Sequence, residues 1–519
     1  MTDSEFDVVI VGGGHNALVA AAYLARAGRR VQVLERLESV GGAAVSAHAF
    51  AGVDARLSRY SYLVSLLPQR IVDDLGARVR LARRSVSSYT PDPATGGRTG
   101  LLVGPGGSFD SVGAGADRAG FDEFYRRCRL VTQRLWPTLL QPLQTAGDAR
   151  RHVLAGGDPD AATAWDALIG QPIGAAICAA VDHDLVRGVL ATDALIGTFA
   201  RTDDPSLAQN VCFLYHLIGG GTGDWDVPIG GMGAVTGALA AAAVSHGAEL
   251  VTGADVYAIT PDGEVRYRCE GRDRVVGARW VMSGVTPSVL ANLLGEPASP
   301  SAPGAQVKVN LMLKRLPRLR DQSVTPEAAF GGTFHINETL SQLDGAYDMA
   351  VSGRVPDPLP CEIYCHSLTD PSILSDELRR SGAQTLTVFG LHTPHALVAA
   401  ADPDAIRTRL RDAVLASLNS VLAEPIQDVV MRDADGNPCI ETKTTADLED
   451  ALGMTAGNIF HGALHWPFAA DDEPLDTPTQ RWGVATAHDR ILLCGSGSRR
   501  GGAVSGIGGH NAAMAVLAS

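Results

Sequence analysis

The first 42 residues constrain the fold more than any other part of the chain. Asp7–Val11 is an apolar run typical of a buried strand, and the glycines Gly12–Gly14 follow it directly. An alanine-rich helical pattern then extends to about Ala27, and Val31–Leu34 has the composition of a second strand that ends at Glu35. A strand, a glycine turn, a helix and a second strand ending in an acid predict a parallel βαβ unit.

Each residue type in this unit has a physical reason. Gly12 permits the tight turn out of the strand, and Gly14 lets the backbone approach a pyrophosphate. Ala17 is small enough for close packing of helix on strand, and the N–H groups of the first turn, which includes Asn16, face the anion. Glu35 follows Gly12 by 23 residues, near the spacing of about 20 at which an acid binds a ribose hydroxyl. We therefore predict a dinucleotide site; a tight turn without a ligand is the alternative.

Bulk properties limit the partners and the compartment. The formal net charge of −14 argues against nucleic acid or an anionic membrane surface as the main partner. The eight cysteines form no CxxC pair and no metal-ligand spacing, so we expect free thiols, no metal and a cytoplasmic protein. A secretory signal pattern and a run of 18 apolar residues are both missing. Peripheral membrane contact through an apolar patch and the oligomeric state stay open.

Three separated segments have the character of a nucleotide-binding domain: residues 1–95, 225–297 and 476–519. The two gaps, 96–224 and 298–475, carry helical stretches and alternating strand patterns without a βαβ rhythm. We predict an α/β fold with a Rossmann-type domain assembled from the three segments. The gaps would form a substrate domain with a mixed β-sheet and a helical cap. A cofactor in contact with both ends of the chain fits FAD better than NAD.

Four motifs resemble a known family. They are DVVIVGGGHNALVAAAYLARAG, ER-x4-GG, PIGGMG and LLCGSGSRRGGAVSGIGGHNAA. They are similar to the phytoene desaturase and carotenoid isomerase group of the flavin amine oxidase superfamily. The nearest branch is that of phytoene dehydrogenase-like proteins similar to pyridine nucleotide-disulfide oxidoreductase domain-containing protein 2. The resemblance covers most of the chain, and it implies non-covalent FAD, two domains and flavin redox chemistry on an organic substrate.

The resemblance also implies which residues contact the cofactor. Glu35 would bind the ribose, and Val256 would offer its backbone to the adenine. Gly506 and Ile507 begin the last helix, whose N-terminus would stabilise negative charge on the reduced ring. The full set of implied contacts is Gly12, Gly14, Asn16, Ala17, Glu35, Arg36, Gly41, Gly42, Val256, Gly495, Ser496, Gly506 and Ile507.

Three side chains are candidates for proton handling. Lys308 is one of only three lysines among 43 basic residues. It lies in an apolar strand resembling the one whose lysine holds a water beside the flavin in many flavin amine oxidases. A buried lysine can shift its pKa for proton transfer, whereas a lysine at a strand edge would reach solvent. His461 and His465 could each serve as acid or base, with a purely structural role as the alternative.

A departure from the family pattern stands in the C-terminal glycine loop. The usual His-Pro pair before the glycines is Arg499-Arg500 here. The two guanidinium groups could bind a substrate carboxylate or phosphate, or stabilise the reduced flavin. Solvent exposure or pairing with acids is the alternative. Because two cations are unusual beside a hydrocarbon pocket, this departure puts a carotenoid substrate in doubt.

Together these features predict an FAD-dependent oxidoreductase, a desaturase or dehydrogenase. It would remove a hydride from a largely apolar organic substrate that can carry an acidic group, and pass electrons to oxygen, a quinone or a carrier. A flavin amine oxidase and a redox-neutral flavin isomerase are the enzymatic alternatives. A non-catalytic escort-type protein on the same fold is the alternative outside enzymes, although such relatives lose the cofactor motifs that this chain keeps.

Overall fold

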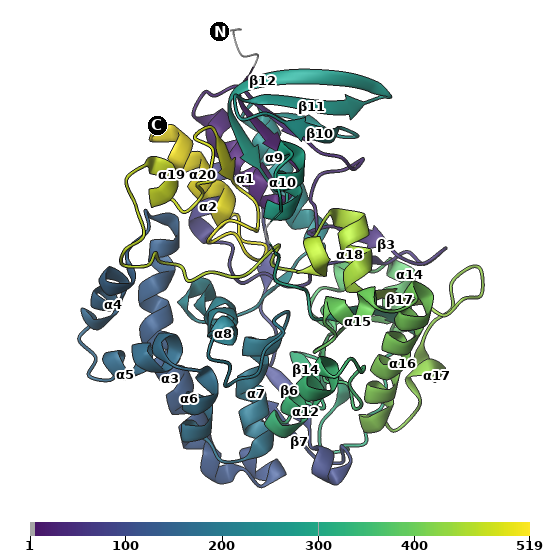
Figure 1. Cartoon of the computed structure of the whole chain (residues 1–519). Coiled ribbons are helices and arrows are strands. Elements are labelled where there is room, and N and C mark those ends of the chain that lie inside the picture. The colour runs from purple at the N-terminus through teal and green to yellow at the C-terminus, as the bar shows by residue number, and fades with distance from the viewer. Residues whose placement is uncertain (1–5, 299) are drawn as a thin grey trace.

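A computed structural model describes residues 6–298 and 300–519. Residues 1–5 and 299, which fall in the predicted segments 1–95 and 298–475, lie outside the described residues. Two separate sheets organise the rest, one in the upper part of Figure 1 and one in the lower part.

The upper sheet has a parallel core in the order β18–β12–β1–β2–β9. Its strands come from three stretches of the chain, coloured purple, teal and yellow in Figure 1. A hairpin extends the sheet, because the first half of β12 pairs antiparallel with β11, and β11 pairs with β10. The strands are β1 (Phe6–Val11), β2 (Val31–Leu34), β9 (Glu249–Val251), β10 (Asp255–Ile259), β11 (Glu264–Cys269), β12 (Arg272–Ser283) and β18 (Ile491–Leu493).

Helix α1 (His15–Arg26) is the centre of the upper domain. It packs against α9 (Met232–Ser245) and α20 (Ile507–Leu517), and every residue from His15 to Ala25 is buried. An alanine-rich sequence suits this place, since small side chains let three helices approach closely and alanine has the highest helix propensity. Helix α10 (Pro287–Leu294) packs beside β10.

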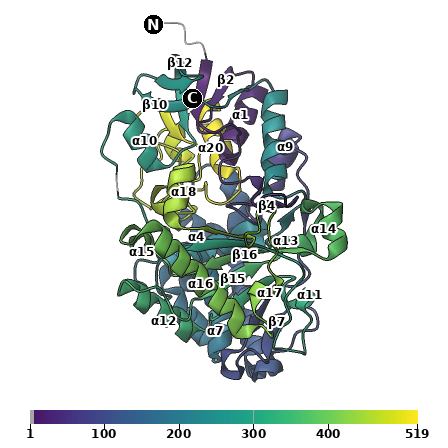
Figure 2. The ribbon, with the colours of Figure 1, turned by 90° about the vertical axis from the view of Figure 1, so that its right-hand side faces the viewer.

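The lower sheet is mixed and runs β17–β13–β16–β15–β14–β6–β7. All its pairs are antiparallel except β14 with β6. The long helix α16 (Pro403–Val421) packs on one face, as Figure 2 shows. The strands are β6 (Ser88–Pro91), β7 (Gly100–Val103), β13 (Val307–Leu313), β14 (Thr333–Ile336), β15 (Cys361–Tyr364), β16 (Gln384–Gly390) and β17 (Ile440–Lys443).

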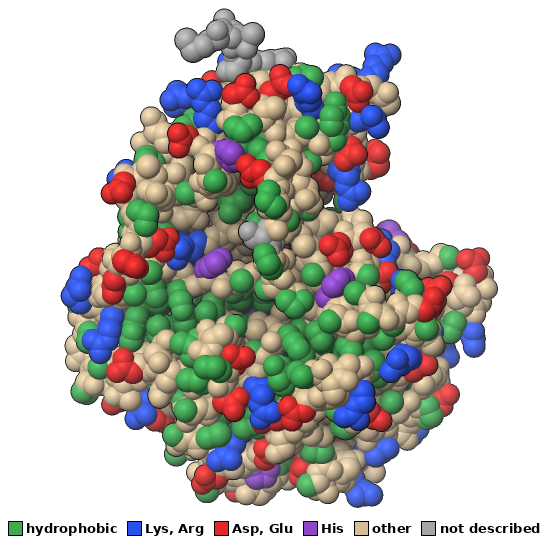
Figure 3. Space-filling model, viewed as in Figure 1, with side chains coloured by type: hydrophobic (Ala, Val, Ile, Leu, Met, Phe, Trp, Pro, Cys, Tyr) green, Lys and Arg blue, Asp and Glu red, His purple; other side chains and the backbone are tan. Residues whose placement is uncertain are grey.

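Helices between residues 118 and 218 form a cap with its own apolar core. They are α3 (Arg118–Leu135), α4 (Ala146–Leu154), α5 (Ala161–Trp165), α6 (Ile173–Ala180), α7 (Asp184–Leu195) and α8 (Ala208–Ile218), seen in blue in Figure 1. Below the upper domain the surface is hollowed, and hydrophobic side chains gather in that hollow in Figure 3.

Shorter elements complete the molecule. The strands are β3 (Ser46–His48), β4 (Arg56–Ser58), β5 (Leu81–Ala82) and β8 (Val227–Pro228). The helices are α2 (Gln69–Leu75), α11 (Pro326–Ala329), α12 (Leu340–Val351), α13 (His366–Thr369), α14 (Asp376–Ser381), α15 (His395–Ala399), α17 (Ile426–Val429), α18 (Thr445–Leu452) and α19 (Pro478–Arg481).

The predicted α/β fold, with a Rossmann-type domain and a second mixed sheet, is confirmed. One boundary differs from the prediction. Residue 95 falls between β6 and β7, and both strands pair within the lower sheet. The first nucleotide segment therefore ends before Ser88. The local sequence pattern does not reveal this boundary, because it depends on which sheet β6 joins.

Two further expectations concern cysteines and membranes. Each of the eight cysteines carries a free thiol, and only Cys178 is exposed. Within residues 6–298 and 300–519, none of the helices combines the length and apolarity needed to cross a bilayer.

Candidate active site

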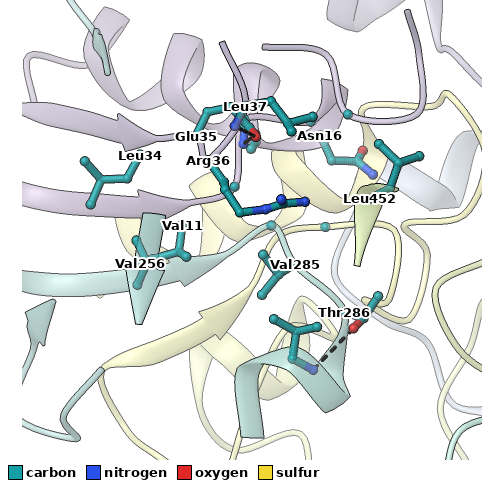
Figure 4. Close-up of a pocket in the computed structure, with 18 of the residues that line it drawn as sticks. Val11, Asn16, Leu34, Glu35, Arg36, Leu37, Val256, Val285, Thr286 and Leu452 are labelled. Atoms are coloured by element: carbon teal, nitrogen blue, oxygen red, sulfur yellow. Dashed lines mark hydrogen bonds between the residues drawn. The ribbon is translucent and has the colours of Figure 1, made fainter. Parts of the chain in front are cut away.

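A cavity lies at the carboxyl ends of β1, β2 and β12, where ligands bind in open α/β sheets. We call it the dinucleotide cavity. Its walls are the glycine turn Gly12–Gly14, the end of β2 with Glu35, the segment Gly284–Thr286 and Ser496. Figure 4 shows Glu35 and Arg36 on one side of this space, with Val285 and Thr286 on the other.

The glycine turn is shaped for close approach of a ligand. Gly12 has φ +89°, and a Cβ there would lie 3.1 Å from Val285 Cγ1. At Gly14 an added Cβ would meet nothing within 4 Å, so this position opens onto the cavity. Gly12 therefore serves the turn itself, whereas Gly14 leaves room for what binds there.

The second glycine pair packs onto this turn. The Gly41 N–H donates to the Gly13 carbonyl at 2.8 Å, and Gly41 has φ +129°. A Cβ on Gly42 would lie 3.2 Å from Gly14 Cα. Gly42 lines the cavity, whereas Gly41 supports the turn from behind.

The Glu35 carboxylate is fixed at the end of β2. Its Oε2 accepts from the Gly13 N–H at 2.7 Å, and its Oε1 accepts from the Leu37 N–H at 2.8 Å. Each oxygen keeps a further lone pair, so the group can also accept from ribose hydroxyls. The Arg36 guanidinium donates to the Ala451 carbonyl at 3.0 Å and borders the same space (Figure 4).

Asn16 joins the first helix to the C-terminal glycine loop. Its Nδ2 donates to the Gly501 carbonyl at 2.9 Å and to Ser496 Oγ at 3.3 Å. Its Oδ1 is buried without a partner among the described residues. Asn16, Ala17, Val256, Gly495 and Ser496 all line the dinucleotide cavity. An unpaired buried acceptor in a glycine-walled cavity fits a bound polar group.

The dinucleotide cavity is not lined by Gly506 or Ile507. Gly506 caps the start of α20 with φ +73°, and a Cβ there would lie 2.9 Å from Val19 Cγ2. Ile507 lines a small separate cavity beside α8. Their predicted contact with the flavin stays a prediction.

A second cavity adjoins the first, and we call it the apolar cavity. His15, Ala43, Met454, His461 and Ser496 line both cavities. The remaining walls include six aromatic side chains from distant segments: Tyr60, Tyr62, Tyr215, Trp225, Phe389 and Phe460. Such walls bind apolar substrates and exclude water.

Lys308 lies in the wall of the apolar cavity and is 2% exposed. Its Nζ donates to the carbonyls of Ser58 at 3.0 Å, Tyr60 at 2.9 Å and Ser61 at 3.4 Å. It also lies 5.3 Å from the centre of the Phe389 ring. Burial lowers its pKa to about 7. The structure therefore excludes the alternative of an ammonium in solvent, and leaves a charge that titrates near neutrality.

Two histidines stand where the cavities meet. Burial lowers the pKa of His461 to about 4, and its Nδ1 has no partner among the described residues. His15 donates from Nε2 to the Ala503 carbonyl at 2.7 Å, and burial lowers its pKa to about 4 as well. Both rings are thus neutral at pH 7. Sequence reasoning missed His15, although it directly follows the glycine turn.

The predicted residues Arg499 and Arg500 make contacts away from the apolar cavity. Arg499 Nη2 forms an ion pair with Glu473, with 2.7 Å to Oε2. Arg500 is 8% exposed and donates to backbone carbonyls, among them Gln141 at 2.8 Å. Burial lowers the pKa of Arg500 to about 9. Arg499 therefore pairs with an acid, the second of the two alternatives considered for these residues.

His465 lies beside these arginines and lines the same small cavity as they do. Burial lowers its pKa. The apolar cavity is not lined by His465, Arg499 or Arg500. Their catalytic roles stay predictions.

A third space, which we call the polar chamber, opens from the apolar cavity. Both share Tyr62, Leu63, His216 and Trp225. The chamber has a volume of about 410 Å³ and is lined by Arg84, Asp193, His335 and Glu362, among others. Burial raises the pKa of Asp193 to about 6. No sequence motif marks this chamber, because its walls come from strands and helices far apart in the chain.

The fold and the dinucleotide cavity define a dinucleotide-binding α/β protein with a second domain built on a second sheet. The family described as "NAD(P)-binding Rossmann-like domain" matches residues 10–70, which hold the glycine turn and Glu35. A solved structure of a putrescine oxidase variant has a TM-score of 0.59, with 17% identity and 99% of both chains covered. At that identity the likeness shows a shared fold.

Relatives match over nearly the whole chain. Uncharacterized protein Rv0897c of Mycobacterium tuberculosis is 68% identical over 524 residues, which cover 99% of this chain and 98% of that protein. The chain belongs to the same family as that protein. Pyridine nucleotide-disulfide oxidoreductase domain-containing protein 2 of Rattus norvegicus is 29% identical over 569 residues, covering 99% of this chain and 93% of that protein.

Proposed function

We propose that this protein is an FAD-dependent desaturase or dehydrogenase that takes a hydride from a largely apolar organic substrate. The observation that carries the proposal is the shared wall of the two cavities, formed in part by His15, His461 and Ser496. A cofactor that extended from Glu35 to Ser496 would end at the apolar cavity. The name of the rat relative and the fold shared with putrescine oxidase both support redox chemistry.

The dinucleotide cavity fits FAD held without a covalent bond. Glu35 would accept from ribose hydroxyls, and the Gly12–Gly14 turn would cradle the pyrophosphate. Val256 would border the adenine, and Gly495 and Ser496 the ribityl chain. FAD bound there would supply the hydride acceptor.

The chain's own residues would orient the substrate and move protons. Aromatic walls would hold the apolar part and keep water out. Lys308, fixed by backbone carbonyls, would place a charge that changes near pH 7 beside the reacting carbon. His461 would offer the free Nδ1 of a neutral ring as a proton acceptor.

The polar chamber would receive the far end of a longer substrate. Arg84 is buried there, donates to the Trp225 carbonyl at 3.0 Å and to Thr333 Oγ1 at 2.7 Å, and forms no ion pair with a described residue. An acidic group on the substrate would find its partner in Arg84, with no role for Arg499.

A flavin amine oxidase is the second candidate, favoured by the aromatic walls of the apolar cavity and the fold shared with putrescine oxidase. None of the described residues that line the apolar cavity is acidic, so a substrate ammonium would find no counter-charge there, which argues against this candidate.

The test begins with the purified protein, which should be yellow and release flavin absorbance on denaturation. Anaerobic bleaching is then followed with neutral apolar, carboxylated and amine compounds. Bleaching by the first two groups supports the proposal, whereas bleaching by amines alone favours an amine oxidase. Colourless protein that cannot be reconstituted with FAD would overturn the enzyme hypothesis and favour an escort-type role.

A further inference from the structure

Three metal-ligating side chains meet in the lower sheet, away from the dinucleotide cavity. His335 lies on β14, Glu338 follows that strand, and Glu362 lies on β15. His335 and Glu362 are direct partners in the antiparallel ladder. One ligand atom from each residue falls within 4.8 Å of the other two, and the residues are 4%, 1% and 3% exposed.

Glu338 is the member of this cluster that most needs a partner. Both carboxylate oxygens are buried, and neither has a hydrogen-bond partner among the described residues. The neighbouring Thr192 hydroxyl has a single hydrogen, which it donates to Glu362 Oε1 at 2.5 Å. Buried carboxylates in folded proteins are paired, hydrogen-bonded or bound to a cation. Glu338 must therefore either take up a proton or bind a cation.

The other two side chains are already oriented. Thr90 Oγ1 lies 3.0 Å from His335 Nδ1, which leaves Nε2 for another partner. Glu362 accepts from Thr192 on one oxygen and from the Tyr364 hydroxyl, at 2.5 Å, on the other. Hydrogen bonds of this kind fix the imidazole and carboxylate ligands of metal centres.

We propose that His335, Glu338 and Glu362 bind one divalent first-row transition-metal ion such as Zn²⁺ or Mn²⁺. A doubly charged ion balances two carboxylates in a buried place, which a lone proton does not. The imidazole favours a transition metal over Mg²⁺ or Ca²⁺, whose ligands are oxygens. Three protein ligands leave a coordination position open.

The site lies apart from the dinucleotide cavity, although two of its residues line the polar chamber. Lys308, Phe389, Glu362 and His335 form one row across the sheet, each the direct partner of the next. At a strand spacing of about 4.8 Å, Glu362 is roughly 10 Å from Lys308 along this row. His335 and Glu362 line the polar chamber, so an ion can enter there. Loss of the ion can therefore be measured without FAD.

The experiment uses the full chain, with any affinity tag removed. The protein is stripped with EDTA, incubated with ZnCl2 or MnCl2 separately, passed through a desalting column and analysed by mass spectrometry for metal. We expect a single retained ion per chain. Glu338→Gln should lose it, and so should Glu362→Gln. Thr90→Ala should weaken binding by about 10–100-fold, the usual effect of removing a supporting hydrogen bond.

Asp193→Asn is the matched control, because Asp193 is a buried acid that lines the same chamber but is not a member of the cluster. It should retain the ion. The proposal is overturned if the wild type retains neither metal. It is also overturned if Glu338→Gln retains as much metal as the wild type. If Glu338→Gln does not fold, the proposal is tested instead by the midpoint of thermal unfolding of the EDTA-stripped wild type. Saturating ZnCl2 or MnCl2 should raise it, and an unchanged midpoint with both would equally overturn the site.

Discussion

The two main cavities are built in different ways. Glycines form a distinct part of the wall of the dinucleotide cavity, among them the turn Gly12–Gly14 and Gly284. The apolar cavity is walled by side chains such as Tyr215 and Phe389 from segments far apart in the chain. A site made of backbone needs glycine at fixed spacing and so leaves a motif. A site made of side chains needs only size and polarity, which many sequences supply.

The strongest test of this contrast compares two glycines of one turn. Gly14→Val adds side-chain atoms to a position that is open in the structure, with φ −69° and ψ 169°, which suit valine. The variant should fold with a normal thermal midpoint but lose FAD, with affinity on the order of 1000-fold weaker, about 4 kcal/mol. Flavin absorbance and fluorescence titration measure this.

Gly12→Ala is the control for that experiment. Here the +89° φ and the 3.1 Å approach to Val285 strain the fold itself, so the thermal midpoint should fall. If Gly14→Val binds FAD normally, the dinucleotide cavity is not the cofactor site.

The next prediction concerns the side-chain cavity. Lys308→Met should keep FAD but slow substrate-dependent flavin reduction by about 10²-fold or more, the usual scale for a lost proton-handling group. Stopped-flow bleaching under anaerobic conditions measures the rate. Phe389→Leu keeps the cavity apolar and serves as control, with a smaller expected effect. Equal rates for Lys308→Met and wild type would remove Lys308 from the mechanism.

Stability against pH gives a more specific test of Lys308. Its pKa is about 7 when folded and 10.5 when unfolded. Between these values the unfolded chain binds more protons, so Lys308 makes wild-type stability rise from pH 7 to about 10.5. Denaturant unfolding should show that the stability advantage of Lys308→Met shrinks over this range. If the difference in unfolding free energy between Lys308→Met and the wild type stays constant over this pH range, the carbonyls of Ser58 and Tyr60 keep the lysine charged.

The smallest effect is expected at Arg499. The side chains of Arg499 and Glu473 are 21% and 33% exposed, so a double-mutant cycle with Arg499→Gln and Glu473→Gln should give a coupling energy of about 0.5–1 kcal/mol. KM for carboxylated substrates should stay unchanged. A rise in KM for acidic substrates alone would restore the hypothesis that Arg499 binds a substrate anion.

The same contrast explains how far sequence reasoning reached. The βαβ unit, Glu35 and the second glycine pair were predictable because local backbone geometry dictates their residue types. Lys308 stood out through its rarity, yet its carbonyl partners could not be inferred. The ion pair of Arg499 could not be inferred, because its partner Glu473 is 26 residues away and burial depends on contacts that no local pattern encodes. No short motif marks the cluster of His335, Glu338 and Glu362, since a strand pairing brings Glu362 next to His335.

The hydrogen bonds from Asn16 to Ser496 and Gly501 also bear on how the protein is made. They join residues that the ribosome produces some 480 positions apart. A nascent chain can form β1, α1 and β2 early, but the wall that holds Ser496 and the packing of α20 on α1 are then still missing. Under the proposed function, capture of the cofactor would therefore wait until β18 and α20 have been synthesised.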